Sequence, residues 1–303
     1  MAQAQQTVGF VGLGLMGRPM ALNLLRAGFA VVVTARRPEA TAPLAEAGAT
    51  VVATPAELAE QAAITISMVA DAPDVAEVTL GPAGIATRAR PGHLHIDMST
   101  IAPGQAQQIA AQLAERQIRF LDAPVSGGEV GAIEGNLTIM VGGDADAFAE
   151  ALPVLQAMGR RITHIGGIGA GQVAKACNQI LTGVTVAAVA EAFTLARAAG
   201  VDPARVREAL LGGFAYSRIL EHHGQRMIER QFLPGFKAWM HQKDMNIVLR
   251  EAQRLGTPAF LSAVTAQLFN AMVGQGLGEA DSIAVLQLLE EMDSYTSLTD
   301  GAR

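Results

Sequence analysis

The sequence predicts an α/β domain with a parallel sheet, followed by an all-helical domain. In the first half, short apolar strand-like runs alternate with stretches of helical spacing. After Gly169 no clear strand follows, and helical periodicity continues to the end. The glycine-rich run "HIGGIGAGQ" separates the two halves and is typical of a hinge. We therefore expect two domains, covering residues 1–165 and 166–303, which fits a chain of 303 residues.

Strands and helices alternate through the first domain. "TVGFVGLG" predicts a strand, and "LMGRPMALNLLRAG" predicts a helix that stops at Gly28. Further strands are expected in FAVVVTAR, AITISMV, HLHIDMST, RFLDAPV, NLTIMVGG and RITHIG, with helices at 55–61, 72–80, 103–116 and 145–158. Apolar strands connected by helices indicate a parallel sheet that is covered on both faces.

The second domain reads as helices alone. Apolar residues recur with helical spacing at 172–199, 203–211, 237–255, 260–275 and 281–292. Their pattern predicts a helical core without a sheet.

Composition excludes several classes of function. The net charge is −6 and no run of basic residues stands out, which argues against nucleic acid as a partner. The single cysteine, Cys177, excludes a disulfide framework and a cysteine-based metal site. The histidines form no compact ligand set either, so no metal is expected.

No membrane segment is expected. The start "MAQAQQTVGF" lacks the basic and apolar regions of a signal peptide. The longest uncharged stretch of the helix at 172–199, residues 176–190, is short and contains Asn, Gln, Gly and Thr, whereas a span needs about 20 apolar residues. A cytoplasmic protein is the expectation.

The run "VGLGLMG" places Gly12, Gly14 and Gly17 in the pattern G-x-G-x-x-G. One glycine makes a tight turn, one lets the backbone approach a pyrophosphate, and one lets helix and strand pack closely. The loop follows a strand and opens a helix, which is the context that a dinucleotide site requires. The fold is then of the Rossmann type. The alternative is a glycine-rich turn without a nucleotide.

The end of the second strand bears on the choice of cofactor. A carboxylate that binds the adenosine ribose is expected there, about 20 residues after the glycine loop. The sequence has Ala35, Arg36 and Arg37 instead. Without a carboxylate a 2'-phosphate is not repelled, and a guanidinium can bind it with paired hydrogen bonds. This favours NADP(H) over NAD(H), unless both arginines are simply solvated.

Four motifs in order carry a resemblance that covers nearly the whole chain. They are GFVGLGLMGRPMALNLLRAG at the start, DAPVSGG at 122–128, GQVAKACNQ with Lys175 and Asn178, and HQKDM with Lys243 and Asp244. In these motifs the sequence resembles the β-hydroxyacid dehydrogenase family. The resemblance implies an NAD(P)-dependent oxidoreductase that interconverts the 3-hydroxyl and 3-oxo forms of a small carboxylic acid.

The resemblance also implies roles for individual residues. Lys175 would be the proton donor or acceptor, and Asn178 would bind the substrate beside it. The substrate carboxylate would be held by Ser126, Gly127 and Gly128. Cofactor contacts are expected at Gly12, Gly14, Leu15, Met16, Gly17, Met68, Val69, Thr100 and Lys243, and, from the strand end described above, at Arg36 and Arg37. The sequence departs from the family where relatives often carry Pro-Asn, because "MVADAP" has Ala70 and Asp71 there.

The chemistry of Lys175 and of the "PVSGG" loop also follows from the residues themselves. Hydride transfer to a carbonyl builds negative charge on its oxygen, and a positioned proton donor is worth about 10²–10⁴ in rate. Burial lowers the pKa of an amine toward neutrality, which suits this task. Lys175, Asn178 and Thr182 share one helix face, and the loop's N–H groups with Ser126 could bind a carboxylate. The alternatives are a lysine that extends to solvent and an ordinary turn.

The stretch "FKAWMHQKDM" indicates a subgroup. With Lys237 and His241 before the Lys-Asp pair, it resembles the tartronate semialdehyde reductases of the family, which reduce 2-hydroxy-3-oxopropionate to glycerate. His241 is therefore a candidate substrate contact. A 3-hydroxyisobutyrate dehydrogenase is the alternative within the family, and a non-catalytic dinucleotide-binding scaffold is the alternative outside it. Apolar surface on the helical domain and the resemblance both imply a homodimer or homotetramer.

Overall fold

The protein folds into two compact units. The structure is a computed structural model in which residues 6–300 are described. The first unit ends at Lys175 and the second begins at Ala176. The boundary expected after residue 165 coincides with the end of the last strand, earlier in the chain than this division. The expectation about a signal peptide concerns a start whose first five residues lie outside the described part of the chain.

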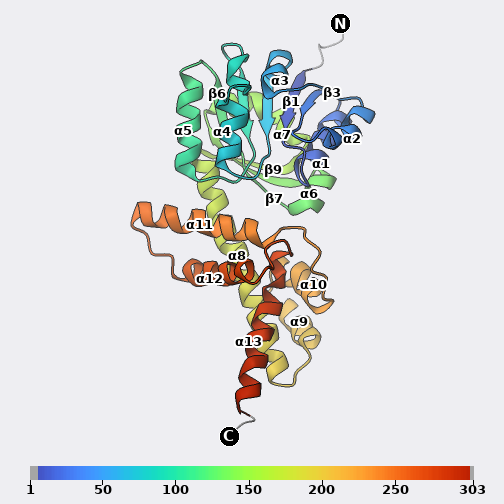
Figure 1. Ribbon diagram of the computed structural model, residues 1–303, viewed down its shortest axis with the longest axis vertical. Coiled ribbons are helices and arrows are strands. Elements are labelled where there is room, and N and C mark those ends of the chain that lie inside the picture. The colour runs from blue at the N-terminus through green and yellow to red at the C-terminus, as the bar shows by residue number, and fades with distance from the viewer. Residues whose placement is uncertain (1–5, 301–303) are drawn as a thin grey trace. The chain divides into compact units, whose positions relative to one another are not determined.

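One nine-stranded sheet forms the centre of the first unit (Figure 1). Its strands are β1 Thr7–Val11, β2 Ala30–Thr34, β3 Thr50–Val51, β4 Ile64–Ser67, β5 Leu94–Asp97, β6 Arg119–Asp122, β7 Val125–Ser126, β8 Leu137–Gly143 and β9 Gly159–Gly166. The strand order is β3-β2-β1-β4-β5-β6-β8-β7, and β9 pairs with β8. From β3 to β6 all pairs are parallel, and the order of connections reverses between β1 and β4. Such a reversal opens a crevice at the carboxyl ends of the strands, where ligands bind in open α/β sheets.

The otherwise parallel sheet has antiparallel pairs at one edge. Strand β8 runs antiparallel to both β6 and β7, and its pairing with β9 is parallel. The connection from β6 to β8 contains the two-residue strand β7 and helix α6 (Gly128–Glu134).

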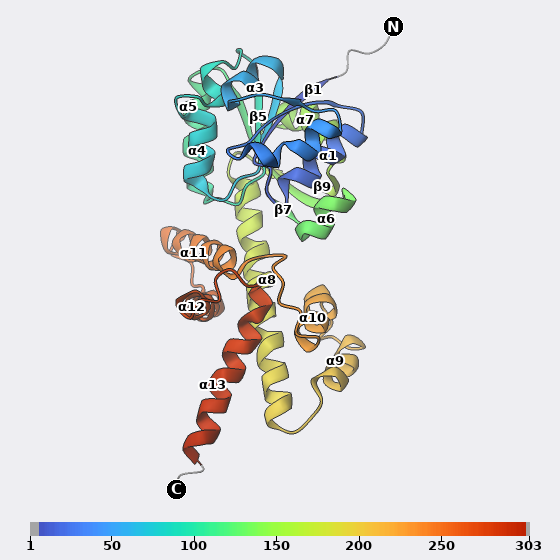
Figure 2. The ribbon, with the colours of Figure 1, turned by 45° about the vertical axis from the view of Figure 1, so that its right-hand side comes forward.

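Helices cover both faces of the sheet. On one side α1 (Gly17–Arg26) and α7 (Ala145–Gln156) contribute to the larger apolar core. On the other side α4 (Ala72–Leu80) and α5 (Pro103–Ala114) pack side by side over a second core (Figures 1 and 2). The shorter α2 (Ala42–Glu46) and α3 (Pro55–Gln61) complete the unit. Helix α3 begins as its sequence predicts, with Thr54 accepting the N–H of Glu57 at 3.2 Å and proline at the first helical position.

The second unit is helical in all of its described elements. Its helices are the later part of α8 (Ala170–Ala198), α9 (Pro203–Leu211), the π-helix Ile219–His223, α10 (Gly224–Ile228), α11 (Ala238–Leu255), α12 (Phe260–Gly274) and α13 (Val285–Asp300). In both views α11 lies beside α12 (Figures 1 and 2). Phe193 of α8, Phe269 of α12 and Leu286 of α13 lie fully buried in one apolar core.

Helix α8 is longer than the uncharged stretch that the sequence analysis considered. Its 29 residues are long and apolar enough to cross a membrane by length and composition, although 44% of the most apolar window is buried within the protein. A buried core helix of a globular protein passes the same test. The absence of a membrane segment therefore remains an expectation.

Candidate functional site

The glycine loop has the geometry that its sequence predicts. Gly12 has φ +96°, and a Cβ there would lie 2.1 Å from the carbonyl oxygen of Met68. A Cβ on Gly17 would lie 1.8 Å from the carbonyl oxygen of Gly12. At Gly14, by contrast, a Cβ would meet nothing within 4 Å. Two glycines thus allow tight packing and the third leaves open space before the start of α1, which fits a pyrophosphate.

The ends of β4 and β5 meet beside this loop. The N–H of Met68 donates to the carbonyl oxygen of Val11 at 3.0 Å. The N–H of Val69 donates to Oγ of Ser99 at 3.0 Å, directly before Thr100. The fold therefore brings Gly12, Met68 and Val69 to one edge of the sheet. It is the edge at which a dinucleotide binds in folds with this strand order.

Arg36 and Arg37 follow the end of β2 at the same edge. The Arg36 side chain is 89% exposed, and its Nη1 lies 3.4 Å from Oδ1 of Asp74 on α4. An exposed ion pair of this kind contributes little to stability. The guanidinium therefore remains accessible to a phosphate, in competition with a carboxylate that the sequence analysis did not consider.

The loop at 125–128, where a substrate is expected and which is called the substrate loop below, lies together with Lys175 in the first unit. Nζ of Lys175 donates to the carbonyl oxygen of Val125 at 2.9 Å, and the residue is only 7% exposed. The alternative of a lysine that extends into solvent is therefore wrong. After Ser126 the chain turns through Gly127 and Gly128, whose φ angles are +138° and +62°. These positive angles favour glycine and turn the backbone sharply at the start of α6.

Asp122 anchors the start of the helix that carries Lys175. Its fully buried carboxylate accepts the N–H of Gly169 on Oδ1 at 2.7 Å and the N–H of Gln172 on Oδ2 at 2.9 Å. These N–H groups would otherwise have no partner at a helix start. Burial raises the pKa of Asp122, while the backbone hydrogen bonds oppose that rise. Only its position in the "DAPVSGG" motif drew attention to Asp122 in the sequence.

A row of buried polar side chains crosses β4 and β5 on one face of the sheet. Oγ1 of Thr65 lies 2.8 Å from Nε2 of His93 and 2.9 Å from Nδ1 of His95. Oγ of Ser67 lies 3.0 Å from Nε2 of His95 and donates to Oδ1 of Asp97 at 2.7 Å. The two-residue period of a strand places all five on the same face.

Burial shifts the pKa values of this row in opposite directions. It lowers the pKa of His95 to about 3, with His93 adding to the effect. Burial and the nearby Arg119 lower the pKa of His93 to about 4. Burial raises the pKa of Asp97 to about 6, against the hydrogen bonds from Ser99 and Ser67. Each shift disfavours the charged form, as burial in a region of low dielectric requires.

In the second unit, the polar stripe of α8 contacts α11. Nδ2 of Asn178 donates to Oε1 of Gln179 at 2.7 Å, and Nε2 of Gln179 donates to Oδ2 of Asp244 at 2.6 Å. Nζ of Lys243 lies 3.1 Å from the other oxygen of Asp244. The Lys-Asp pair of the sequence motif is thus an ion pair, tied by a glutamine to the helix that carries Asn178.

His241 is packed as a core side chain. Its ring stacks on Phe269 at a centroid distance of 4.4 Å and meets the edge of Phe236 at 5.2 Å. The residue is 1% exposed. This packing fixes the imidazole within the second unit, so its contact with a substrate remains a prediction.

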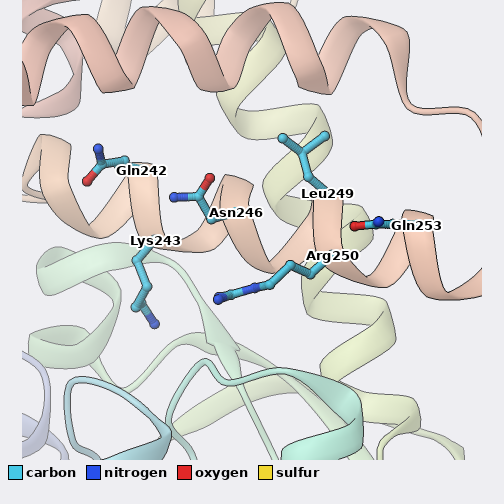
Figure 3. A pocket seen from close by; sticks show the side chains of 6 residues that line it. All are labelled: Gln242, Lys243, Asn246, Leu249, Arg250 and Gln253. Carbon is cyan, nitrogen blue, oxygen red and sulfur yellow. The ribbon is translucent and has the colours of Figure 1, made fainter.

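A cavity of about 440 Å³ lies along α11 (Figure 3). It is lined by Gln242, Lys243, Asn246, Leu249, Arg250 and Gln253. Lys243 and Arg250 extend from the same side of the helix, which gives that side positive charge. Of these residues only Lys243 was expected at a site. Asn246 and Arg250 follow it at i+3 and i+7, and this helical spacing places them on the same face.

Comparison with known proteins identifies both units. Residues 7–166 match the NAD binding domain of 6-phosphogluconate dehydrogenase. Residues 169–289 match the NAD-binding domain of NADP-dependent 3-hydroxyisobutyrate dehydrogenase.

Relatives that match along nearly their whole length are named as dehydrogenases or reductases. A 2-hydroxy-3-oxopropionate reductase of Escherichia coli is 46% identical over 95% of this chain and 98% of its own. A 3-hydroxyisobutyrate dehydrogenase of Pseudomonas aeruginosa is 40% identical over 87% and 91%. The crystal structure of a 3-hydroxyisobutyrate dehydrogenase from Salmonella typhimurium has a TM-score of 0.86 at 33% identity and covers 94% of this chain and 100% of its own.

The glycine loop and the sheet order supply a dinucleotide-binding domain, and a buried lysine lies beside a glycine-rich loop at the start of a helical domain. The two relatives described above are named as a reductase and a dehydrogenase. The chain belongs to the β-hydroxyacid dehydrogenase family and is an enzyme with NAD(P)-binding domains.

Proposed function

We propose that this enzyme reduces 2-hydroxy-3-oxopropionate to glycerate with NADPH. The observation that carries the proposal is the buried Lys175 amine, which is hydrogen-bonded to Val125 at the start of the substrate loop. The 46% identity to a 2-hydroxy-3-oxopropionate reductase supports this substrate over other small 3-oxo acids.

Each part of the site then has a chemical task. Bound NADPH would supply the hydride, held at the glycine loop and beside Met68, Val69 and Thr100. Ser126 and the N–H groups of Gly127 and Gly128 would bind the substrate carboxylate. Nζ of Lys175 would donate a proton to the carbonyl oxygen, where negative charge develops. Asn178, one turn further along α8, would bind the substrate beside the lysine, and Lys243 would contact the cofactor.

NADP(H) is the cofactor that the end of β2 favours. Arg36 and Arg37 offer two guanidinium groups and no carboxylate at the position of the adenosine ribose. In the test, kcat/KM is compared for NADPH and NADH in the wild type and in Arg36→Ala. We expect the preference for NADPH to fall by about tenfold, which corresponds to one charge-assisted hydrogen bond of about 1.4 kcal/mol. An unchanged ratio would remove Arg36 from the argument.

The catalytic role is tested with Lys175→Met, which keeps the length of the side chain and removes the amine. We expect turnover to fall at least about 100-fold because the proton donor is lost. NADPH binding, followed by the change in cofactor fluorescence, is expected to stay close to the wild type. Turnover retained in this variant would refute the proposed chemistry.

The substrate is tested with a panel of small semialdehydes and hydroxy acids. The highest kcat/KM is expected with 2-hydroxy-3-oxopropionate. A higher value with 3-hydroxyisobutyrate would establish the alternative, which the matched domain model and the 40% identical relative support. We also propose a homodimer or homotetramer in the cytoplasm, since Leu181 and Leu195 on α8 are 70% and 72% exposed.

A further inference from the structure

Gln172 connects three separate parts of the first unit. It is the third residue of α8 and is 1% exposed. Its Nε2 donates to the carbonyl oxygen of Ser99 at 2.8 Å, and its Oε1 accepts the N–H of Ile101 at 3.2 Å. Its backbone N–H donates to Asp122, as described above. One side chain therefore holds the loop after β5 on both sides of Thr100.

That loop belongs to the cofactor edge of the sheet. Oγ of Ser99 accepts the N–H of Val69 at 3.0 Å, and Val69 lies against Gly12 of the glycine loop. A continuous series of hydrogen bonds and packing contacts thus runs from the glycine loop through Ser99 to Gln172. All of its members lie in the first unit.

Gln172 also lies one turn before Lys175 on the same helix. Residues at i and i+3 share a face, so the glutamine clamp and the amine point to the same side of α8. The helix packs closely on the sheet at this point, because a Cβ on Gly171 would lie 2.4 Å from the carbonyl oxygen of Met140 and 2.6 Å from that of Asp122. The position of the amine is therefore set by contacts at its own end of the helix.

We propose that Gln172 is a positioning residue that fixes Lys175 relative to the loop bearing Thr100. Hydride and proton must reach the two ends of one carbonyl bond, so an error of about 1 Å in the distance between their donors can cost about 100-fold in rate. The inference rests on the proposed function of Lys175. It adds a residue that contacts neither substrate nor cofactor and acts through the geometry of those that do.

The main experiment compares Gln172→Leu with Gln107→Leu in the intact enzyme. Leucine at 172 removes both side-chain hydrogen bonds at similar volume. Gln107 is the matched control because it makes one exposed hydrogen bond, to the carbonyl oxygen of Ile168 at 3.2 Å, near the same helix start. We expect kcat to fall about 10- to 100-fold in Gln172→Leu while the affinity for NADPH changes less than about threefold. The control is expected to match the wild type.

A second variant provides a pH signature that a merely structural role would lack. In Gln172→Glu an ionised carboxylate would face the carbonyl oxygen of Ser99, acceptor against acceptor. A protonated carboxyl group could donate to Ser99 and accept from Ile101, as glutamine does. The ratio of its kcat to that of the wild type is therefore expected to rise about tenfold between pH 8 and pH 5.5, with no such rise in Gln172→Leu.

A double variant separates this inference from the proposed function. If Gln172 acts through Lys175, Lys175→Met with Gln172→Leu will be no slower than Lys175→Met alone. Additive losses would overturn the positioning role, as would a wild-type kcat in Gln172→Leu or a parallel loss of NADPH affinity. An active Lys175→Met variant would instead refute the lysine chemistry, whatever the glutamine variants do.

Discussion

The start of helix α8 and the segment around Gln179 are held by different kinds of contact. At its start, the N–H groups and the Gln172 side chain bond to backbone carbonyl and N–H groups and to the buried carboxylate of Asp122. Seven residues later, Gln179 bonds to the side chains of Asn178 and Asp244. The backbone partners at the start of α8 have fixed positions, whereas the side-chain partners around Gln179 can rotate. The start is therefore suited to precise placement of Lys175, and the segment around Gln179 can tolerate substitution.

Two glycines on α8 offer the sharpest way to break this comparison. In Gly171→Ala the new methyl group would lie 2.4 Å from a backbone oxygen, which cannot move without distorting β8. In Gly183→Ala it would lie 3.0 Å from Sδ of Met245 and 3.2 Å from Nε2 of His241, which are side-chain atoms at longer distances.

We expect Gly171→Ala to lower the free energy of unfolding by about 1–3 kcal/mol or more and kcat by about 100-fold. Gly183→Ala is expected to stay within about 1 kcal/mol of the wild type, because alanine favours the helix by a similar amount. Urea unfolding and steady-state kinetics of the pair measure both effects. Equal losses of stability and of kcat in the two variants would contradict the distinction between the start of α8 and its middle part.

A smaller loss of stability and activity is expected from a substitution that affects the segment around Gln179. Asp244→Asn keeps an acceptor for Gln179 but removes the negative charge 3.1 Å from Nζ of Lys243. The free energy of unfolding should fall by about 1–3 kcal/mol, the cost of leaving a partly buried charge without its counterion. If Lys243 contacts the cofactor, as proposed, KM for NADPH should rise more than kcat falls. A loss confined to kcat would show that the contacts around Gln179 also position Lys175.

The smallest expected effect is the change of the free energy of unfolding with pH. The buried polar row on β4 and β5 contributes to it. The pKa values of His93 and His95 are lowered from 6.5 to about 4 and about 3, so their contribution to stability is present above pH 6.5 and is lost as pH falls toward those values. The raised pKa of Asp97, about 6, acts in the opposite sense, since protonation relieves the burial of its charge. Asp122 has the same sign as Asp97.

His223 in the second unit, with a pKa lowered to about 4, adds to the histidine side. Each fully titrating histidine costs up to about 1.4 kcal/mol per pH unit below 6.5. The enzyme should therefore be less stable to urea at pH 5 than at pH 7.5. His95→Gln should be less stable at pH 7.5 but lose about 2 kcal/mol less on acidification to pH 5. The same acid-induced loss in variant and wild type would exclude His95 as a source.

Residues with a requirement of their own could be predicted from the sequence. Gly12 and Gly17 are needed because a side chain at either position would collide with the backbone. Their spacing in the G-x-G-x-x-G pattern predicts this requirement. Lys175 was identified because a charged side chain in an apolar helix needs a reason. The parallel strands β1, β2, β4, β5 and β6 follow from apolar runs between helices, whereas β3 has only two residues, both exposed, and no such run predicts it.

Features that depend on distant partners could not be predicted. Gln172 bonds to residues more than 70 positions earlier in the chain, and nothing in its neighbours indicates this. The antiparallel return of β8 depends on which strand it meets, and its own sequence suits either direction. His241 reads as a polar neighbour of the Lys-Asp pair, but Phe236 and Phe269 enclose it in the core.

The buried row from His93 to Asp97 has a direction. Each hydroxyl in it has one hydrogen to give, and each neutral imidazole has one N–H, so the donors follow one another head to tail. With Asp97 ionised, the hydrogens of Ser67, His95 and Thr65 all point along the row, and Thr65 takes its hydrogen bond from Nε2 of His93. If Oδ1 of Asp97 instead carried a proton and donated it to Ser67, every hydrogen bond of the row would run the other way, and His95 and His93 would both exchange tautomers. The protonation state of Asp97, at the end of β5, would thus determine which nitrogen of each histidine in the row carries the hydrogen.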